Sequence, residues 1–323
     1  MTTTTNTLAA LRSAAIVVGE PDVVDGLAVF PLTGEESRLA FLSFAEAAAA
    51  GATVQELRGG ASVNDLLVHN PLDVPVLLFE GEEVLGAQQN RTFDVTVLVP
   101  ARSELQVPVS CVEHGRWDGT RSDEAFRPSP QTADPELRRR KNAMARAAVS
   151  HGGEARADQS AVWSYIDEKA EALDAHAPTR AMHDVFGARE DLLAKAATGV
   201  TRRPGQLGAV AVAGGKPIVC DWVGRAEAFA ALHGPLVRGY ALDAVAEPAA
   251  EVPGVEELQG WVTSALQAHA SVRPTPGLGE SLHFVNAIIE GTALAHDGEL
   301  VQLCAFPGER REARAIRRPS RRV

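Results

Sequence analysis

Polar side chains interrupt runs of apolar and β-branched residues in the first third of the chain. They lie in the stretches FEGEEVLGAQQNRTF (79–93) and SCVEHGRW (110–117). Carboxylates beside guanidinium and amide groups suit recognition of a polar ligand, because arginine presents a rigid fork of donors and amides both donate and accept. A partly desolvated carboxylate can also act as a general base. We therefore single out six residues: Glu82 and Glu113 as catalytic candidates, and Gln89, Asn90, Arg91 and Arg116 as ligand-binding candidates.

The neighbouring apolar segments predict how these residues come together. Residues 92–99 and 105–113 read as strands of a hairpin that turns at 100–104. The register favoured by this turn places Arg91 opposite Glu113 and Phe93 opposite Cys111, all on one sheet face. The side chains on this face are apolar up to the Arg91–Glu113 pair, which lies at the end of the face. The alternative is that Arg91 and Glu113 form only a cross-strand ion pair, worth about 0.2–1 kcal/mol.

Cysteine and histidine spacing argues against other chemistry. Cys111, Cys220 and Cys304 lie far apart without a CxxC pair, which predicts reduced, buried thiols in a cytoplasmic protein. The nine histidines show no His-x-His, His-x-x-x-His or His-Glu-x-x-His spacing, so we predict no metal site. No phosphate-binding loop or GxGxxG motif follows a strand, and the sequence identifies no cofactor.

The net charge of the chain limits the classes of partner that it is expected to bind. The net charge of −11 argues against a general nucleic-acid coat. The last fourteen residues, RREARAIRRPSRRV, carry +6 and leave −17 on the rest. We predict that residues 309–323 form a disordered, arginine-rich tail; the alternative is an arm for nucleic acid or an acidic partner. Neither a signal peptide nor an apolar run of about 20 residues is present, so we expect a cytoplasmic protein that does not enter a membrane.

The order of elements predicts an α+β fold. Residues 1–120 read as mostly β, an antiparallel sandwich or partial barrel with one helix capped by Ser43 and Glu46. Residues 121–200 read as an exposed loop followed by helices, the first capped by Asp134. Residues 201–308 read as helices with two hairpins that turn at Gly-Gly and Asp-Gly. These three regions are either separate or parts of one domain.

The residues LLFEGEEVLGAQQNRTF, VPVSCVEHGRW and VRGYALDAV carry a resemblance. They are similar to those of the ARG and rhodanese-phosphatase-superfamily-associated protein domain family, an uncharacterised bacterial family. The resemblance runs from about Val18 to Phe306. The family name records association with ADP-ribosylglycohydrolase-like and phosphatase-like domains, which implies a role near ADP-ribose, NAD or phosphate esters. It transfers no catalytic residue.

Two classes of function follow. In the first, the polar cluster binds or processes a nucleotide-like small molecule such as ADP-ribose, an NAD-related molecule or another phosphate-bearing compound. In the second, the protein is a non-catalytic assembly or partner-binding module, and the cluster is structural. Converging side chains in a cavity would favour the first class, and side chains fully paired with one another would favour the second. A homo-oligomer fits either class.

Overall fold

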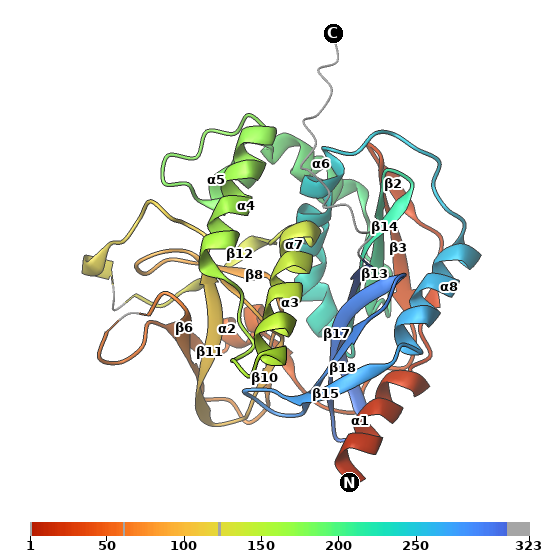
Figure 1. Ribbon diagram of the computed structural model, residues 1–323, viewed down its shortest axis with the longest axis horizontal. Coiled ribbons are helices and arrows are strands. Elements are labelled where there is room, and N and C mark those ends of the chain that lie inside the picture. The colour runs from red at the N-terminus through yellow and green to blue at the C-terminus, as the bar shows by residue number, and fades with distance from the viewer. Residues whose placement is uncertain (1, 61, 122–123, 309–323) are drawn as a thin grey trace.

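The computed structural model describes residues 2–60, 62–121 and 124–308. The arginine-rich tail predicted over 309–323 lies outside the described residues. The fold is α+β, as the sequence predicts. A half-barrel and a nine-stranded sheet stand side by side, with helices packed over their junction (Figure 1).

The nine-stranded sheet joins N-terminal strands to C-terminal hairpins, and all of its pairs are antiparallel. Its order is β1-β3-β13-β14-β18-β17-β16-β15, with β2 also paired to β3. The strands are β1 (Val17–Val18), β2 (Asp22–Val24), β3 (Leu27–Thr33), β13 (Gly208–Ala213), β14 (Lys216–Val223), β15 (Ala270–Pro274), β16 (Glu280–Val285), β17 (Ile289–His296) and β18 (Glu299–Pro307). Both turn residues have positive φ in the β13–β14 and β17–β18 hairpins, which confirms the two predicted turns.

The half-barrel carries the predicted polar residues. A six-stranded sheet, β12-β8-β9-β11-β6-β5, curves beside a three-stranded sheet, β10-β7-β4, in which only the short β4–β7 pair is parallel. The strands are β4 (Leu42–Ser43), β5 (Thr53–Gln55), β6 (Asp65–Asn70), β7 (Val76–Leu78), β8 (Glu82–Leu85), β9 (Arg91–Phe93), β10 (Val97–Val99), β11 (Ser103–Cys111) and β12 (Arg127–Thr132). Val54, Val84, Phe93 and Val109 belong to the apolar cluster that these strands enclose.

The helices are α1 (Thr2–Ser13), α2 (Phe44–Ala49), α3 (Pro135–Ser150), α4 (Gln159–Ala172), α5 (Met182–Gly187), α6 (Glu190–Gly199), α7 (Ala226–Ala244) and α8 (Val255–Leu266), with a 3₁₀ turn η1 (Gly119–Arg121). Helices α2, α3 and α4 begin at residues whose side chains cap them. Ser43 and Glu46 form the predicted capping box of α2. The Asp134 side chain accepts from the Leu137 N–H and caps α3, which starts at Pro135 as expected.

One apolar cluster links the half-barrel to the large sheet. It contains Phe79 from the half-barrel, Leu137 from α3, Phe229 from α7 and Ala211 from β13. Helices α3 and α7 therefore pack between the two β structures (Figure 1). Helices α1 and α8 contribute to a second cluster on the other face of the large sheet, which includes Leu11. The half-barrel is thereby held in a defined place against the rest of the molecule.

Three details differ from the sequence-based expectations. The segment around Pro128 and Pro130, expected to be an exposed loop, forms strand β12 with Ser129, Gln131 and Thr132 buried. Glu82–Leu85, which the sequence does not predict as a strand, forms strand β8. The two helical segments expected on either side of Pro235 form the single helix α7.

The expected boundaries at residues 120 and 200 do not coincide with the sheets. Strand β3 pairs with β13, and β12 pairs with β8. We therefore propose that the described residues form one domain, which was one of the two alternatives.

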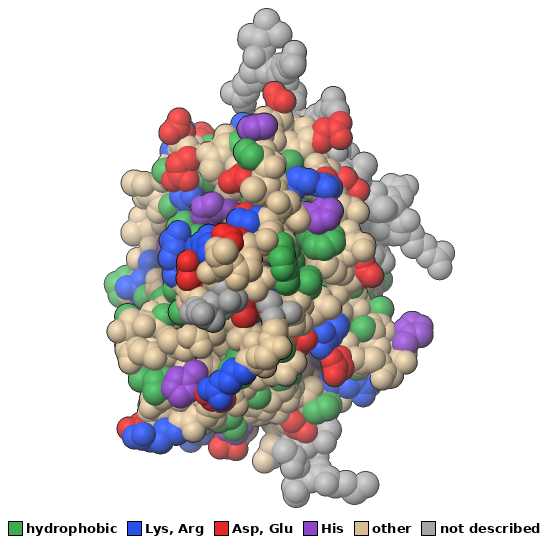
Figure 2. All heavy atoms as spheres, turned by 90° about the vertical axis from the view of Figure 1, so that its left-hand side faces the viewer, with side chains coloured by type: hydrophobic (Ala, Val, Ile, Leu, Met, Phe, Trp, Pro, Cys, Tyr) green, Lys and Arg blue, Asp and Glu red, His purple; other side chains and the backbone are tan. Residues whose placement is uncertain are grey.

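On the face that Figure 2 shows, Lys and Arg side chains are interspersed with Asp and Glu side chains. This face, at the half-barrel side of the molecule, thus presents mixed charge. None of the helices formed by the described residues is both long and apolar enough to cross a membrane.

Candidate functional site

The structure brings five of the six candidate residues together at one end of the half-barrel. Gln89 and Asn90 lie in the turn before β9, and Arg91 is the first residue of β9. Glu113 and Arg116 follow the end of β11. All are buried except Arg116, which is partly exposed. Glu82 lies apart from these five residues: its carboxylate accepts a hydrogen bond from the Phe79 N–H at 2.7 Å, within its own turn.

The predicted register is wrong by two residues. Arg91 pairs with Cys111 and Phe93 with Val109, so Arg91 does not lie opposite Glu113. The cause is that Val97–Val99 leaves the hairpin to pair with β7, while the first half of β11 pairs with β6. A slip of two residues preserves the sheet face. The apolar face therefore ends at a polar cluster, as expected, but with different partners.

Glu113 and Arg116 form an ion pair joined by two hydrogen bonds, and we call this pair with its bonded neighbours Asn90 and Thr179 the clasp. Arg116 Nε and Nη2 donate to Glu113 Oε1 and Oε2 at 2.8 and 2.6 Å. Arg116 also donates to the Ala87 carbonyl and to Asn90 Oδ1. The Asn90 N–H and the Thr179 hydroxyl donate to Glu113 at 3.1 and 3.0 Å. This clasp ties the Gln89–Asn90 turn to the segment after β11.

The clasp defines the charge state of Glu113. Burial acts to raise the pKa of Glu113, but the hydrogen bonds from Arg116 and the Asn90 N–H outweigh it, and the pKa lies below the ordinary value. The carboxylate is therefore ionised and already engaged by three groups. A general base needs a free lone pair directed at its substrate, so the structure offers no observation that favours this role for Glu113.

Arg91, unlike Glu113, is incompletely hydrogen-bonded. Its side chain has 0% exposure. Nη1 makes two long hydrogen bonds, to Gln89 Oε1 at 3.3 Å and to the Asn90 carbonyl at 3.4 Å. Nε and Nη2 have no hydrogen-bond partner among the described residues. Burial lowers the pKa of Arg91, against the opposing charges of Cys111 and Glu56.

Glu56 is the carboxylate nearest to these donors, and the sequence reasoning missed it. Its Oε1 lies 3.9 Å from Arg91 Nη2, which is too long for a hydrogen bond. Neither oxygen of Glu56, nor Oε1 of Gln88, has a partner within the part of the chain that the structure describes. Burial raises the pKa of Glu56, and both Arg91 and the nearby Gln88 backbone N–H oppose this rise, although the N–H does not reach hydrogen-bonding geometry. Glu56, Gln88 and Arg91 thus contribute five buried polar atoms without partners; we call these three residues the Arg91 site.

An aromatic side chain lies over the Arg91 site. The Arg91 Cζ atom is 5.9 Å from the centroid of the Trp117 ring, a distance typical of a cation–π contact. Trp117 is 51% exposed. A guanidinium, a carboxylate, an amide and an indole face together provide donors, acceptors and a stacking surface. This set suits a planar, polar ligand.

The Cys111 thiol does not act as a nucleophile in this environment. All three cysteines are free and buried, as predicted. Burial raises the pKa of Cys111, although Arg91 acts in the other direction. Its Sγ donates to Gln89 Oε1 at 3.1 Å. Because the thiolate is the reactive form, this environment keeps Cys111 inert.

The two glutamates of β8 have separate surroundings. Burial raises the pKa of Glu82 to about 8. Glu83 accepts from Ser129 Oγ at 2.6 Å and from Gln131 Nε2 at 2.8 Å. Its bond with His183 is the main cause of the raised pKa of this histidine. Among the described residues, no three His, Cys, Asp or Glu side chains are grouped so that they could hold a metal ion.

Comparison with known families agrees with the expected resemblance. The model of the ARG and Rhodanese-Phosphatase-superfamily-associated Protein domain matches residues 15–306. The chain belongs to this family. The match includes the Arg91 site, the clasp and all three sheets except Pro307, the last residue of β18, so the associated-protein domain is the unit that the structure describes. No curated protein matches significantly, and no solved structure does.

Proposed function

We propose that this associated-protein domain binds a small molecule that contains a ribose phosphate, such as ADP-ribose or an NAD-related compound, at the Arg91 site. One observation carries the proposal: Arg91 is completely buried, its Nε and Nη2 have no hydrogen-bond partner among the described residues, and Nη2 lies 3.9 Å from the buried carboxylate of Glu56. Leaving a buried donor or acceptor unpaired costs about 1–3 kcal/mol for each group. A ligand that supplies the missing partners recovers this free energy.

The chemistry of the three residues selects the ligand class. Arg91 Nε and Nη2 are donors with the geometry that phosphate oxygens accept. Glu56 and the Gln88 amide oxygen are acceptors that suit ribose hydroxyls. Trp117 offers an indole face for an adenine ring. Because Trp117 is half-exposed and lies over Arg91, we propose that a ligand reaches the guanidinium by displacing this side chain.

The family name supports the same class by association. It joins this domain to ARG and rhodanese-phosphatase partners. We propose binding and not catalysis, because Glu113 is engaged by the clasp and Glu82 lies apart from the Arg91 site.

Thermal unfolding in the presence of ligand tests the proposal. ADP-ribose, NAD, ribose 5-phosphate and inorganic phosphate are titrated against the wild-type protein. We expect ADP-ribose to raise the Tm, with about 2.7 kcal/mol of added stability at a hundredfold excess over Kd. Arg91→Met, which retains apolar bulk, should abolish the rise. Arg58→Met is the matched control, because Arg58 is exposed and pairs with Glu104.

A specific observation favours a second function, the assembly module. Glu113, Asn90 and Arg116 satisfy one another within the clasp. If none of the four ligands changes the Tm of the wild-type protein, or if the rise persists in Arg91→Met, ligand binding at the Arg91 site is wrong. The assembly module then becomes the better account.

A further inference from the structure

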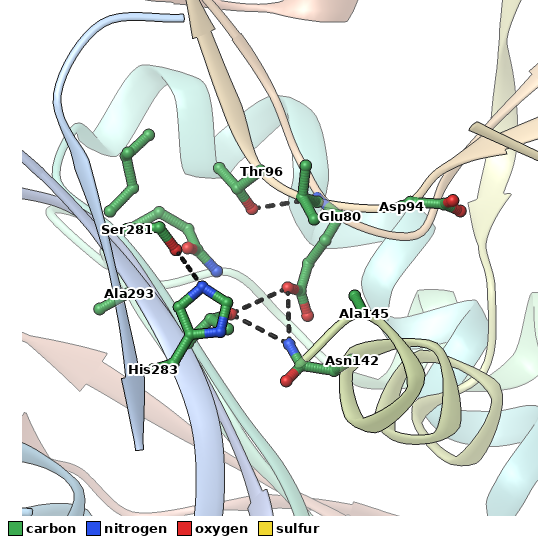
Figure 3. A pocket seen from close by; sticks show the side chains of 12 residues that line it. Glu80, Asp94, Thr96, Asn142, Ala145, Ser281, His283 and Ala293 are labelled. Atoms are coloured by element: carbon green, nitrogen blue, oxygen red, sulfur yellow. Dashed lines mark hydrogen bonds between the residues drawn. The ribbon is translucent and has the colours of Figure 1, made fainter. Parts of the chain in front are cut away.

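A second polar pocket lies where the half-barrel, α3 and the large sheet meet (Figure 3). Glu80 reaches it from the turn between β7 and β8, Asn142 from α3 and His283 from β16. The cavity has a volume of about 20 Å³, enough for one or two non-hydrogen atoms. The pocket shares no residue with the Arg91 site.

The deepest side chain of this pocket is unsatisfied. Gln302 lines the pocket with 0% exposure, and neither its Oε1 nor its Nε2 has a partner among the described residues. Glu80 is also buried. Its Oε2 accepts from Asn142 Nδ2 at 3.2 Å and from Thr292 Oγ1 at 3.1 Å, while Oε1 has no hydrogen-bond partner among the described residues. The carboxylate also lies close enough to the buried Cys304 thiol to contribute to the raised pKa of that thiol. Buried amides and carboxylates are normally paired, so these atoms indicate a group that occupies the pocket.

The charge beside Glu80 is negative. Arg138 makes two hydrogen bonds to Asp221, at 2.9 and 2.6 Å, and its Nη2 lies 3.7 Å from Glu80 Oε1. One buried cation therefore faces two buried carboxylates. Asp94 does not add to this charge, because its carboxylate points away from the pocket in Figure 3 and pairs with Lys141 at 2.9 Å. The Glu80 side of the pocket consequently favours a cationic group.

The remaining lining groups are mostly acceptors. The Thr96 and Ser281 hydroxyl oxygens and the His283 ring face the same space. Ser281 Oγ and His283 Nε2 are 2.9 Å apart. Burial, together with the charges of Arg146 and Arg273, lowers the pKa of His283 to about 4, so the ring is neutral at pH 7. Arg146 is paired with Glu290, which also pairs with Arg139.

We propose that this pocket binds the primary ammonium group of a small amine. Glu80 Oε1 and Gln302 Oε1 accept two of its three N–H donors, and a hydroxyl oxygen of the lining accepts the third. The volume admits an ammonium group and its first carbon. The rest of the amine extends past Ser281 and His283, which are only partly buried.

Methylammonium chloride is the probe for a first test by thermal unfolding. Tetramethylammonium chloride, which has no N–H donor, and sodium chloride serve as matched salts. We expect methylammonium alone to raise the Tm of the wild-type protein, by about 2–4 °C for each kcal/mol of binding free energy. An equal response to all three salts, or no response to any of them, would overturn the proposal.

Three variants locate the effect. Glu80→Gln removes the charge, and Gln302→Met removes the amide while retaining similar bulk. Both should lose the methylammonium response, whereas Glu104→Gln, at a half-exposed position of β11, should keep it. If Gln302→Met unfolds at a higher Tm than the wild type while the response is retained, the amide has no ligand and the proposal is wrong. Arg91→Met should still respond, which separates this pocket from the Arg91 site.

Discussion

Arg91 and Glu56 face each other inside the half-barrel, with 3.9 Å between Nη2 and Oε1. They come from different hairpins, since Glu56 follows β5 and Arg91 begins β9. Both side chains are buried, and the facing atoms form no hydrogen bond. A buried ion pair with incomplete hydrogen bonding contributes little net stability, because the desolvation of both charges opposes their attraction. The pair is better explained by a ligand than by the stability of the fold.

The first prediction follows from the opposition between the desolvation of Arg91 and Glu56 and their mutual attraction. The double variant Arg91→Met with Glu56→Leu should unfold with a free energy equal to that of the wild type or about 1–4 kcal/mol higher. Glu56→Leu alone should cost about 3–5 kcal/mol, because it leaves an uncompensated buried guanidinium. Urea unfolding of the four proteins gives the coupling energy between the two sites. A double variant that is as unstable as the sum of the single variants would show that the apolar pair cannot replace the charged pair.

The second prediction concerns the clasp. Arg116→Ala should destabilise the protein by about 2–4 kcal/mol, because it removes both charge-assisted bonds to the buried Glu113. The pKa of Glu113 is lowered in the folded state, so its contribution is present above the unfolded pKa and is lost as pH falls through the folded pKa. Equilibrium unfolding should therefore show a larger effect of Arg116→Ala at pH 7 than at pH 3. An effect of the same size at both values would mean that the charge of Glu113 has no part in it.

Local signals in the sequence predict local structure well. The Ser43 and Glu46 capping box and the two hairpin turns depend on residues within three positions of one another. The apolar face of β9 and β11 was also predictable, since alternation defines it. The register was not, because a slip of two residues places every side chain on the same face. Alternation alone therefore could not choose Cys111 over Glu113 as the partner of Arg91.

Contacts between segments far apart in the sequence explain the remaining differences between expectation and structure. Pro128 and Pro130 suggest a loop, yet β12 is an edge strand of the six-stranded sheet, and an edge strand tolerates residues without an N–H. Glu56 stands 35 residues before Arg91, in a segment without a motif. Nothing in its spacing identifies it as the missing partner. The same applies to Gln302, which meets Glu80 only because the large sheet packs against the half-barrel.

The third prediction is a pH dependence due to Glu82. Burial raises its pKa from 4.5 to about 8. The folded state thus holds a proton that the unfolded state releases, and stability is lost as pH rises from about 5 to 8. The loss is at most about 5 kcal/mol, at about 1.4 kcal/mol for each unit of pKa.

Glu82→Gln isolates this effect from that of other buried acids, such as Asp243, whose pKa is raised to about 7. The variant should lose less stability than the wild type between pH 5 and 8, as measured by urea unfolding at several pH values. Parallel curves for the two proteins would exclude Glu82 as the source.

The fourth prediction tests how the segment that carries the clasp packs against the backbone of Thr179. Gly115 lies between Glu113 and Arg116, and its N–H donates to the Thr179 carbonyl at 2.7 Å. A Cβ atom at Gly115 would lie 2.8 Å from that oxygen and 3.0 Å from the Thr179 carbonyl carbon. Because these are backbone atoms, the clash can be relieved only by a shift of one segment. We expect Gly115→Ala to cost about 1–3 kcal/mol of unfolding free energy.

Gly119→Ala is the matched control for this substitution, in the same loop. A Cβ atom at Gly119 would meet no atom within 4 Å, so this variant should stay within about 0.5 kcal/mol of the wild type. Gly115→Ala should also weaken the bond between Thr179 and Glu113, since the hydroxyl reaches the carboxylate only while the two segments are in contact. A cycle with Thr179→Val measures this coupling. If the two glycine variants are equally stable, the Thr179 segment is not packed against Gly115, and Glu113 is held by Arg116 and Asn90 alone.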